Sequence, residues 1–476
     1  LKCVHLGPFI LLKRRVAFRV LSAKSLLFFI FNIYSILIIY FIFIFKILKI
    51  IFIYTLVQKL YIIMKLVEQH IIKKSNADFK KIDNLCWLSK NLYNAALYHI
   101  KQHFEATGKW IRYNDLEKDF SSNNNPDYRV LPPATSQQIL MVVDKNLKSY
   151  FALLKKYKKN KKSLLGCPKF PKYKHKIKGR NILIFTNQQA RHKPDKSIIR
   201  FPKLTELHPL KTKVQGKLNQ VRIIPTSGCY KIEVVYEKPE EQLVEPNNNY
   251  LSIDLGLNNL MACYDSQDSI SLIVPGKPLK SMNQYYNKKK SKLQTKLKKN
   301  HNKYVSKKTK QLNFKRNNKI KDYLHKSSRF IVNYCLESGI SNIVLGYNLE
   351  WKQGINLGKK TNQNFVQIPF ATLINQIQYK AKLVGITVTL NEESYTSKCS
   401  ALDLEEVCKH EIYLGKRIKR GLFVSSNGTK INADLNGAIN ILRKVTGDKV
   451  FGESHRQTQT SRGQVRWPLK INLYKN

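Results

Sequence analysis

LSIDLG, at residues 251–256, is an apolar strand pattern that contains one carboxylate, Asp254, and closes on a turn residue, Gly256. A charge left unpaired on such a strand costs on the order of several kcal/mol, so Asp254 is expected either to bind a ligand or to be hydrogen-bonded. Downstream, a strand pattern at 342–345 is followed by a helix at 368–384, a strand at 386–390 and a helix from about 434 to 444. This alternation predicts an α/β sheet with crossover connections.

A second carboxylate, Asp434, opens the last helix in INADLNGAIN, residues 431–440. An acid at this place is commonly the N-cap of the helix. The alternative is catalytic. Phosphodiester hydrolysis with two metal ions needs carboxylates that converge from different elements, because Mg²⁺ takes oxygen ligands. The spacing alone gives both interpretations equal weight.

The composition is strongly basic, with 84 Lys and Arg against 31 Asp and Glu and a formal charge of +53. Such self-repulsion in a compact fold indicates a polyanionic partner, and nucleic acid is the obvious one. A chain of 476 residues holds two or three domains, which disfavours a short, merely basic protein of the ribosomal type.

Two stretches concentrate this charge. Residues 155–178 interleave lysines with prolines and aromatic residues, and are expected to lie extended along phosphates. Residues 288–321 contain no acid and keep helical spacing at Leu293, Leu297 and Tyr304, which predicts a long helical arm against a nucleic-acid backbone. A solvated linker and a solvated helix are the respective alternatives.

Residues 1–63 differ in character from the rest. The stretch 26–45 carries no charge and is long enough to cross a bilayer. The segment is rich in the residues that AT-rich DNA encodes when it is read without selection, and Met64 opens a different pattern. We therefore expect residues 1–63 to be mis-assigned upstream translation, with a genuine membrane anchor or signal segment as the alternative.

From Met64 onward the patterns predict a series of modules. Residues 64–74 form a strand of a β-rich module, and apolar residues at spacings of three and four predict a helical module at 75–160. Residues 161–245 combine a basic linker with the remaining β-rich module, with strands at 182–185, 221–224 and 230–236. Residues 246–445 form the α/β domain, with the basic helical arm at 280–338, and residues 446–476 form a tail.

The eight cysteines are scattered singly, with no CxxC pair, which indicates a reducing compartment. Cys399 and Cys408 lie near each other in sequence. No second ligand pair completes a tetrahedral site, so structural zinc is not expected.

Several long motifs, in order from Met64 to Lys444, resemble the transposon-encoded OrfB/TnpB family. They are MKLVEQHIIKKS at 64, SKNLYNAA at 89, GCPKFPKYK at 166, IDLGLNN at 253, ESYTSK at 393, GKRIKRGLF at 415 and INADLNGAINILRK at 431. The resemblance implies an RNA-guided, Mg²⁺-dependent DNA endonuclease with an RNase H-like (RuvC) α/β nuclease domain, preceded by a helical module and a small β-rich, WED-like module. It also implies a DNA target and a guide RNA derived from the transposon end. We expect a cytoplasmic, nucleoid-associated protein, with no membrane role if residues 1–63 are not genuine.

The family's metal triad is Asp, Glu, Asp, and the resemblance assigns Asp254 and Asp434 to its first and third places. The glutamate normally ends a strand, at a position that Gly346 fills here. Glu350 follows that strand, where an ordinary surface ion pair is the simpler interpretation.

Two further acids, Glu392 and Glu393, follow the strand at 386–390, which we expect to neighbour the strand of Asp254. Their side chains point to opposite faces, so only one can reach the site. Resemblance to subfamilies with a relocated glutamate in the ESYTS motif favours Glu393, with Glu392 as the fallback. Asp254, Glu393 and Asp434 would then hold two Mg²⁺ ions; a degenerate, inactive site is the alternative.

Many relatives carry two cysteine pairs where this chain has only Cys399 and Cys408, and the basic run 416–421 is expected to replace them as a contact surface. The candidate nucleic-acid contacts are Lys169, Lys172, Tyr173, Lys174, Lys288, Lys289, Lys290, Lys292, Lys416, Arg417, Lys419 and Arg420. A catalytically silent DNA- or RNA-binding derivative is the second functional hypothesis, and a membrane-tethered basic protein is the third.

Overall fold

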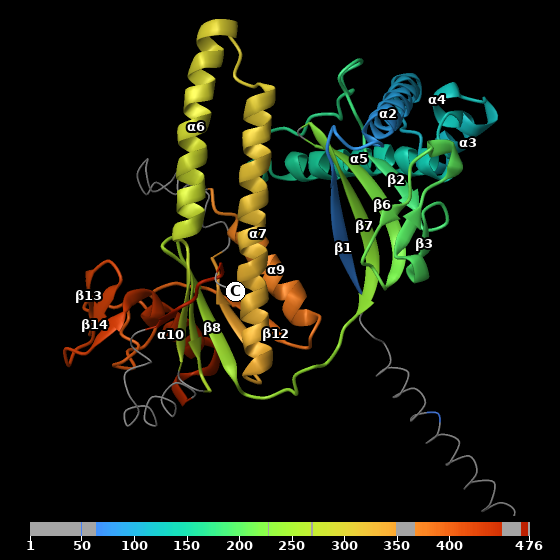
Figure 1. Ribbon diagram of the computed structural model, residues 1–476. Coiled ribbons are helices and arrows are strands. Elements are labelled where there is room, and N and C mark those ends of the chain that lie inside the picture. Colours follow the sequence, from blue (N-terminus) through green and yellow to red (C-terminus); the bar gives the residue numbers. More distant parts are fainter. Residues whose placement is uncertain are drawn as a thin grey trace, which may run out of the picture. The chain divides into compact units, whose positions relative to one another are not determined.

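The computed structural model describes residues 49, 63–226, 228–267, 270–348, 367–449 and 468–474. Two larger sheets organise the chain, one within residues 63–239 and the other within residues 250–470 (Figure 1). The charge-free stretch 26–45 lies outside the described residues. Within the described ranges, no helix is long and apolar enough to span a membrane.

The first sheet contains four antiparallel strands in the order β1-β7-β6-β2. These strands are β1 (Ile63–Ile72), β2 (Leu183–Thr186), β6 (Lys217–Thr226) and β7 (Cys229–Pro239). Strands β1 and β7 pair along the whole of β1, from Ile63 opposite Pro239 to Ile72 opposite Tyr230. The first strand of the β-rich module therefore pairs with a strand that lies far along the sequence. A small second sheet, β3-β4-β5, is made of β3 (Arg191–Lys193), β4 (Ile198–Arg200) and β5 (Leu210–Lys211), with short 3₁₀ turns η2 (Pro194–Lys196) and η3 (Lys203–Thr205).

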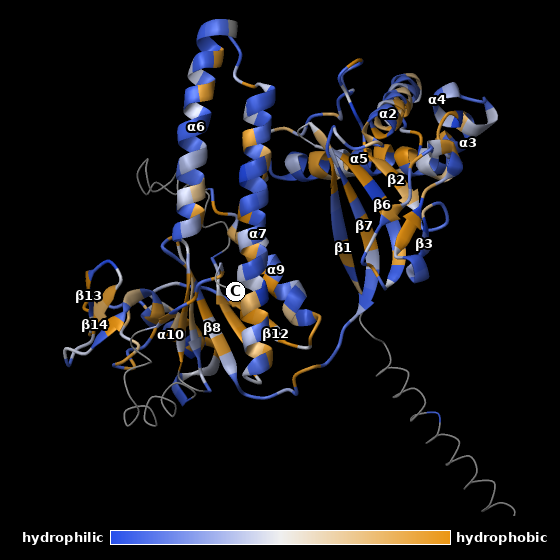
Figure 2. Cartoon of the chain, viewed as in Figure 1, coloured by the Kyte–Doolittle hydropathy of each residue, from blue (hydrophilic) through white to orange (hydrophobic). Residues whose placement is uncertain are grey.

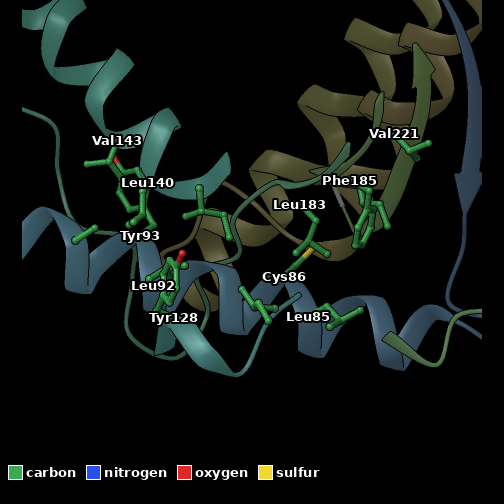
Figure 3. Packing of buried hydrophobic residues seen from close by; sticks show 14 of the residues in the cluster. Leu85, Cys86, Leu92, Tyr93, Tyr128, Leu140, Val143, Leu183, Phe185 and Val221 are labelled. Atoms are coloured by element: carbon green, nitrogen blue, oxygen red, sulfur yellow. The ribbon is translucent and has the colours of Figure 1, made fainter. Parts of the chain in front are cut away.

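Four helices follow β1 and share one apolar core with the first sheet: α2 (Phe79–Thr107), α3 (Tyr113–Ser122), α4 (Pro126–Arg129) and α5 (Pro133–Lys159). Figure 3 shows this packing: Leu92 of α2 and Leu140 of α5 are both fully buried, as is Leu183 of β2. Burying a leucine side chain contributes about 1.5–3 kcal/mol. Pro133 suits the first turn of α5, because that position needs no backbone N–H donor.

The basic segment after α5 is bound to α2 rather than free in solution. Helix α5 continues to Lys159 and a 3₁₀ turn, η1 (Lys161–Ser163), follows it, so the start of this segment is helical rather than extended. Ser89 Oγ donates to the carbonyl of Ile182 at 2.7 Å, and Lys90 Nζ donates to the carbonyl of Lys176 at 2.6 Å. The SKNLYNAA motif therefore supplies side chains that hold the basic segment against α2.

The second sheet has the strand order β12-β11-β8-β9-β10-β16. Strand β9 is antiparallel to both β8 and β10, β11 is parallel to β8, β12 is parallel to β11 and β16 is parallel to β10. The bounds are β8 (Tyr250–Leu255), β9 (Asn259–Asp265), β10 (Ser271–Pro275), β11 (Asn342–Gly346), β12 (Thr387–Asn391) and β16 (Leu469–Lys470). The α/β character predicted from the alternating patterns is confirmed. The order also corrects one expectation, because β11 lies between β12 and β8.

Helices cover both faces of this sheet. Leu251, Ile253 and Leu255 of β8 join one core with α7 (Lys307–Glu337) and α9 (Phe370–Lys382). On the other face, α10 (Ala433–Thr446) packs against β8, β9 and β11 and forms a core of its own with Val344. Alternation along β8 turns Asp254 towards the face that α10 covers.

The basic arm consists of two helices, not one. Helix α6 (Lys277–His301) and α7 run side by side as an antiparallel hairpin (Figure 1). Asn302 takes the left-handed conformation (φ 45°) that ends α6, and a capping box between Ser306 and Thr309 begins α7. Tyr304 lies in the break, so its expected helical spacing was wrong. Figure 2 shows that the outer part of α6 is hydrophilic on nearly every turn.

Three short strands precede α10 and form a small antiparallel sheet, β13-β14-β15. They are β13 (Lys416–Lys419), β14 (Leu422–Val424) and β15 (Lys430–Asn432). Strand β13 carries most of the basic run 416–421, which was predicted to be a contact surface.

The Asn94→Ala variant is expected to release the basic segment from α2. Asn94 Nδ2 donates to the carbonyl of Lys174 at 2.9 Å, and the Lys174 N–H donates to Asn94 Oδ1 at 2.9 Å, so alanine removes both bonds. Two such bonds contribute roughly 1–3 kcal/mol together. Limited proteolysis should cleave residues 164–180 faster in this variant, whereas Lys101→Ala on the exposed face of α2 should leave the rate unchanged. Equal cleavage rates in both variants would contradict the anchoring role.

Candidate metal centre

Asp254 lies between the second sheet and α10. A methyl group on Gly437 of α10 would stand 3.1 Å from Asp254 Oδ2, so the absence of a side chain at Gly437 lets the helix approach the carboxylate. Burial raises the pKa of Asp254 well above its usual value, and the nearby charges of Glu393 and Asp434 raise it further. Arg417 opposes this rise. The carboxylate is therefore held where its charged form is unfavourable without a cation.

Asp434 is not the cap of α10, so the structural interpretation of this residue was wrong. Asn432 is the N-cap, and its side chain accepts hydrogen bonds from the N–H groups of Asp434 and Leu435 at 3.0 and 3.3 Å. The carboxylate of Asp434 instead accepts a hydrogen bond from Asn259 Nδ2 at 2.7 Å and forms an ion pair with Arg417 Nη2 at 3.0 Å. An acid in the first turn is also favoured by the positive end of the helix dipole.

Glu393 follows β12, two residues beyond its end. Its backbone N–H donates to Asn348 Oδ1 at 2.9 Å, and its carbonyl accepts from Thr396 Oγ1 at 2.9 Å. Within the described residues, Glu393 Oε1 is buried and has no hydrogen-bond partner. Burial raises the pKa of Glu393 from 4.5 to about 7. A buried carboxylate oxygen without a hydrogen-bond donor fits the role of a metal ligand.

The other two acids have different surroundings. The side chain of Glu392 is 65% exposed, lies 3.7 Å from Lys444 Nζ and accepts a hydrogen bond from Ser394 Oγ. This is an ordinary surface arrangement, so the geometry favours Glu393 over its fallback. Glu350 lies outside the described residues.

Helix α10 also holds the segment that follows Glu393. Asn436 Nδ2 donates to the carbonyl of Cys399 at 2.8 Å and Asn440 Nδ2 donates to the carbonyl of Thr396 at 2.9 Å; both asparagines are buried. Arg443 continues this row one turn further and donates to the carbonyl of Glu405 at 2.9 Å. None of these positioning residues was predicted from the sequence. Their signal was polar residues at spacings of four and three on one side of a mostly apolar helix.

The three predicted acids meet in one region, since the charges of Glu393 and Asp434 both act on Asp254. Their oxygen donors suit a hard cation such as Mg²⁺. In the parts of the chain that the structure describes, however, no group of three or more His, Cys, Asp or Glu side chains converges closely enough to hold a metal ion. The Asp434 carboxylate is engaged instead by Asn259 and Arg417.

The two cysteines of this region bind protein groups. Cys399 is buried, and its thiol donates to the carbonyl of Cys408 at 3.4 Å. The Cys408 thiol lies 3.4 Å from His410 Nε2. These contacts form a short loop between Glu393 and β13.

The predicted nucleic-acid contacts fall on three surfaces, and most of their side chains are exposed. Lys174 is an exception, because its ammonium group lies 4.9 Å from the ring of Tyr93 and burial lowers its pKa. Lys290 is partly buried and lies 5.7 Å from the ring of Tyr286. Arg417 pairs with Asp434, so it belongs to the candidate metal centre. The exposed candidates are Lys169, Lys172 and Tyr173 on the basic segment, Lys288, Lys289 and Lys292 on α6, and Lys416, Lys419 and Arg420 at β13.

Family models match two regions of the chain. Residues 233–352 match OrfB_IS605, described as a probable transposase, and residues 370–441 match the Cas12f1-like TNB domain. The TnpB-like protein ORF457 of Acidianus two-tailed virus is 24% identical over 405 residues, covering 77% of this chain and 84% of the relative. The TnpB-like protein MJ0751 of Methanocaldococcus jannaschii is 28% identical over 191 residues, covering 36% of this chain and 66% of the relative.

Solved structures show similarity over most of the chain. The Cas12f1–sgRNA–target DNA complex aligns with 15% identity and a TM-score of 0.46, covering 76% of this chain and 81% of that protein. The mini-RNA-guided endonuclease CRISPR-Cas_phi3 aligns with 12% identity and a TM-score of 0.42, covering 80% and 92%.

The Glu393→Gln variant is expected to stabilise the metal-free protein at high pH. The folded-state pKa of Glu393 is raised from 4.5 to about 7, so the folded protein binds this proton more tightly than the unfolded chain. Stability therefore falls as pH rises from 4.5 to 7, by on the order of a few kcal/mol. Glutamine cannot ionise and should remove this loss.

Urea unfolding at pH 5 and pH 8, with a chelator present, measures the effect. The gain from Glu393→Gln should be larger at pH 8. The exposed neighbour provides the control: Glu392→Gln should change stability equally at both pH values. A gain that does not depend on pH would show that Glu393 is not strained by burial.

Proposed function

Because the chain belongs to the TnpB/OrfB family, as its motifs predicted, we propose that it is an RNA-guided, Mg²⁺-dependent DNA endonuclease with an RNase H-like (RuvC) nuclease domain. The second sheet with α7, α9 and α10 would be the nuclease domain. Asp254, Glu393 and Asp434 would hold the metal ions, and the helical and β-rich modules would bind the guide RNA and the DNA.

The observation that carries this proposal is the pair of buried carboxylates beside α10. Asp254 and Glu393 both have raised pKa values, and Glu393 Oε1 has no hydrogen-bond partner within the described residues. A purely structural role gives no reason to desolvate two acids together. Perturbed carboxylates of this kind gather at functional sites.

Each residue of the centre has a role in the proposed reaction. Bound Mg²⁺ would activate the attacking water and stabilise the charge on the leaving oxygen. Asp254 would supply an oxygen ligand from β8, Glu393 a second from the segment after β12, and Asp434 a third from α10. Asn259 orients the Asp434 carboxylate through its 2.7 Å hydrogen bond. The apolar contacts of α10 exclude water from the inner side of the centre.

Guide RNA and target DNA are proposed as partners on the basis of family membership and charge. The chain carries a formal charge of +53, and its exposed lysines line α6 and the segment held on α2. Both surfaces would contact phosphates, because lysine side chains bind nucleic acid through charge without reading sequence. We propose that the guide derives from the transposon end.

A catalytically silent nucleic-acid-binding protein is the second candidate function. One observation favours it: Asp434 is engaged by Arg417 and Asn259, and no metal-binding group of three acids is formed among the described residues. Such a protein would keep the basic surfaces and the sheet but would not hydrolyse DNA.

The Asp254→Asn, Glu393→Gln and Asp434→Asn variants are each expected to lose DNA cleavage by orders of magnitude while nucleic-acid affinity stays close to that of the parent. Each removes one metal ligand and changes a single charge on a strongly basic protein. The assay uses the full chain co-expressed with flanking transposon RNA, sequencing of the bound RNA, and plasmid cleavage with Mg²⁺. Glu392→Gln is the matched control and should cleave normally. Absence of cleavage by the parent, with RNA still bound, would favour the second candidate.

Replacing Lys288, Lys289, Lys290 and Lys292 by glutamine is expected to flatten the salt dependence of nucleic-acid binding. Each phosphate contact contributes roughly −0.7 to −0.9 to the slope of log affinity against log salt. Filter binding between 50 and 200 mM salt, about the range over which such contacts weaken binding strongly, measures this slope. A control with Lys196, Lys203, Lys211 and Lys213 replaced loses the same charge elsewhere. Equal slopes in the two variants would show that α6 faces solvent in the complex.

A further inference from the structure

Gly346 ends β11 at the level of the candidate metal centre. It pairs with Asn391 of β12, and the neighbouring residue Leu345 pairs with Ile253 of β8. The parallel register therefore places Gly346 beside Asp254. Val344 packs on the α10 side of the sheet, and alternation turns position 346 to that same face.

Close contact, rather than backbone conformation, explains the glycine at this position. Gly346 is not among the residues with positive φ. A Cβ atom built on it would stand 2.6 Å from Glu393 Oε1 and 2.7 Å from Glu393 Cγ, well inside van der Waals contact. It would also stand 2.5 Å from Ile441 Cδ1. The Glu393 side chain therefore fills the space that a side chain at position 346 would need.

This contact explains how Glu393 can approach Asp254 from a strand that is not its neighbour. Strand β12 is not adjacent to β8, so an acid from β12 must pass the end of β11 to reach Asp254. Adjacent strands lie about 4.8 Å apart, so matching positions of β12 and β8 are separated by about two such spacings. Because Gly346 has no side chain, the Glu393 side chain can lie directly over the end of β11.

We propose that Gly346 is a positioning residue of the metal centre, whose missing side chain admits the carboxylate of Glu393. The proposal rests on the function proposed above. Side chains at positions 346 and 393 exclude each other from the same space, so the centre accepts a carboxylate from only one of the two positions. A methyl group at 346 would meet side-chain atoms of Glu393 and Ile441 rather than backbone atoms, so it would disturb the centre much more than the fold.

The converse arrangement follows from the same distances. An aspartate carboxylate oxygen is two bonds from its Cβ atom, and the space between the Cβ position of residue 346 and Glu393 Oε1 is of similar length. Aspartate at 346 could therefore place an oxygen where Glu393 Oε1 lies, once Glu393 is shortened to alanine. The Gly346→Asp/Glu393→Ala double variant should regain Mg²⁺ binding and cleavage that Glu393→Ala alone has lost.

The test measures DNA cleavage, Mg²⁺ affinity by calorimetry and thermal stability for Gly346→Ala, Glu393→Ala and their combination. Gly346→Ala should weaken Mg²⁺ binding and cleavage about 10- to 100-fold, as loss of a residue that orients a metal ligand commonly does, with little change in Tm. In the Glu393→Ala background the same alanine should have little further effect on Mg²⁺ affinity, because only its contact with Ile441 remains. Glu392→Gln is the control, since the Glu392 side chain is exposed and lies beside Lys444 and Ser394 at the surface.

A crystal structure of Gly346→Ala keeps this proposal separate from the proposed function. It should show the Glu393 carboxylate moved away from Asp254 while β11 and β12 keep their pairing. If Gly346→Ala displaces Glu393 but the parent protein binds no Mg²⁺, the positioning role is supported and the proposed nuclease function is rejected. An unmoved Glu393, or an equal loss from Gly346→Ala with and without Glu393, would overturn the positioning role.

Discussion

The α/β domain depends on one constraint: acidic side chains lie near one another where they are shielded from water. Asp254 and Glu393 are both desolvated, and the charges of Glu393 and Asp434 make the charged form of Asp254 still less favourable. Neighbouring elements are arranged around this cost: Gly437 brings α10 against Asp254, and Arg417 brings a positive charge from β13. A domain that retains such an arrangement gives up stability locally in return for a site that can bind a cation.

Much of the fold could be predicted because its strongest patterns are periodic. The apolar run of β8, the apolar stripe of α2 and the final helix all lie close to their predicted positions. The reason is that the periodic apolar residues in the sequence are the ones that pack into the core. The hairpin of α6 and α7 could not be predicted, because lysines continue through the turn and conceal it. Its end depends on one left-handed residue, Asn302, and on a cap at Ser306, which are local features inside a uniform composition.

The candidate centre was predictable in its residue types but not in its geometry. Strand order is a tertiary property, and the expectation that β12 would neighbour β8 placed Glu393 one strand too near. The role of Asp434 depended on which residue capped the helix, and Asn432 two positions earlier took that place. The asparagines of α10 were passed over because their hydrogen bonds go to backbone carbonyls that are distant in sequence, so only their own spacing on the helix indicated a role.

The attachment of the basic segment to α2 has a thermodynamic consequence for any polyanion that meets it. Fixing one backbone residue costs about 1–2 kcal/mol of conformational entropy, and a free lysine-rich tail would lose that entropy when it binds. Here Ser89, Lys90 and Asn94 order the segment during folding, while Lys169, Lys172 and Tyr173 stay exposed. The entropic cost of ordering is thereby shifted from association to folding, where the apolar core of α2 and α5 offsets it. A ligand then meets a preorganised surface, and dissociation becomes the step through which affinity is tuned.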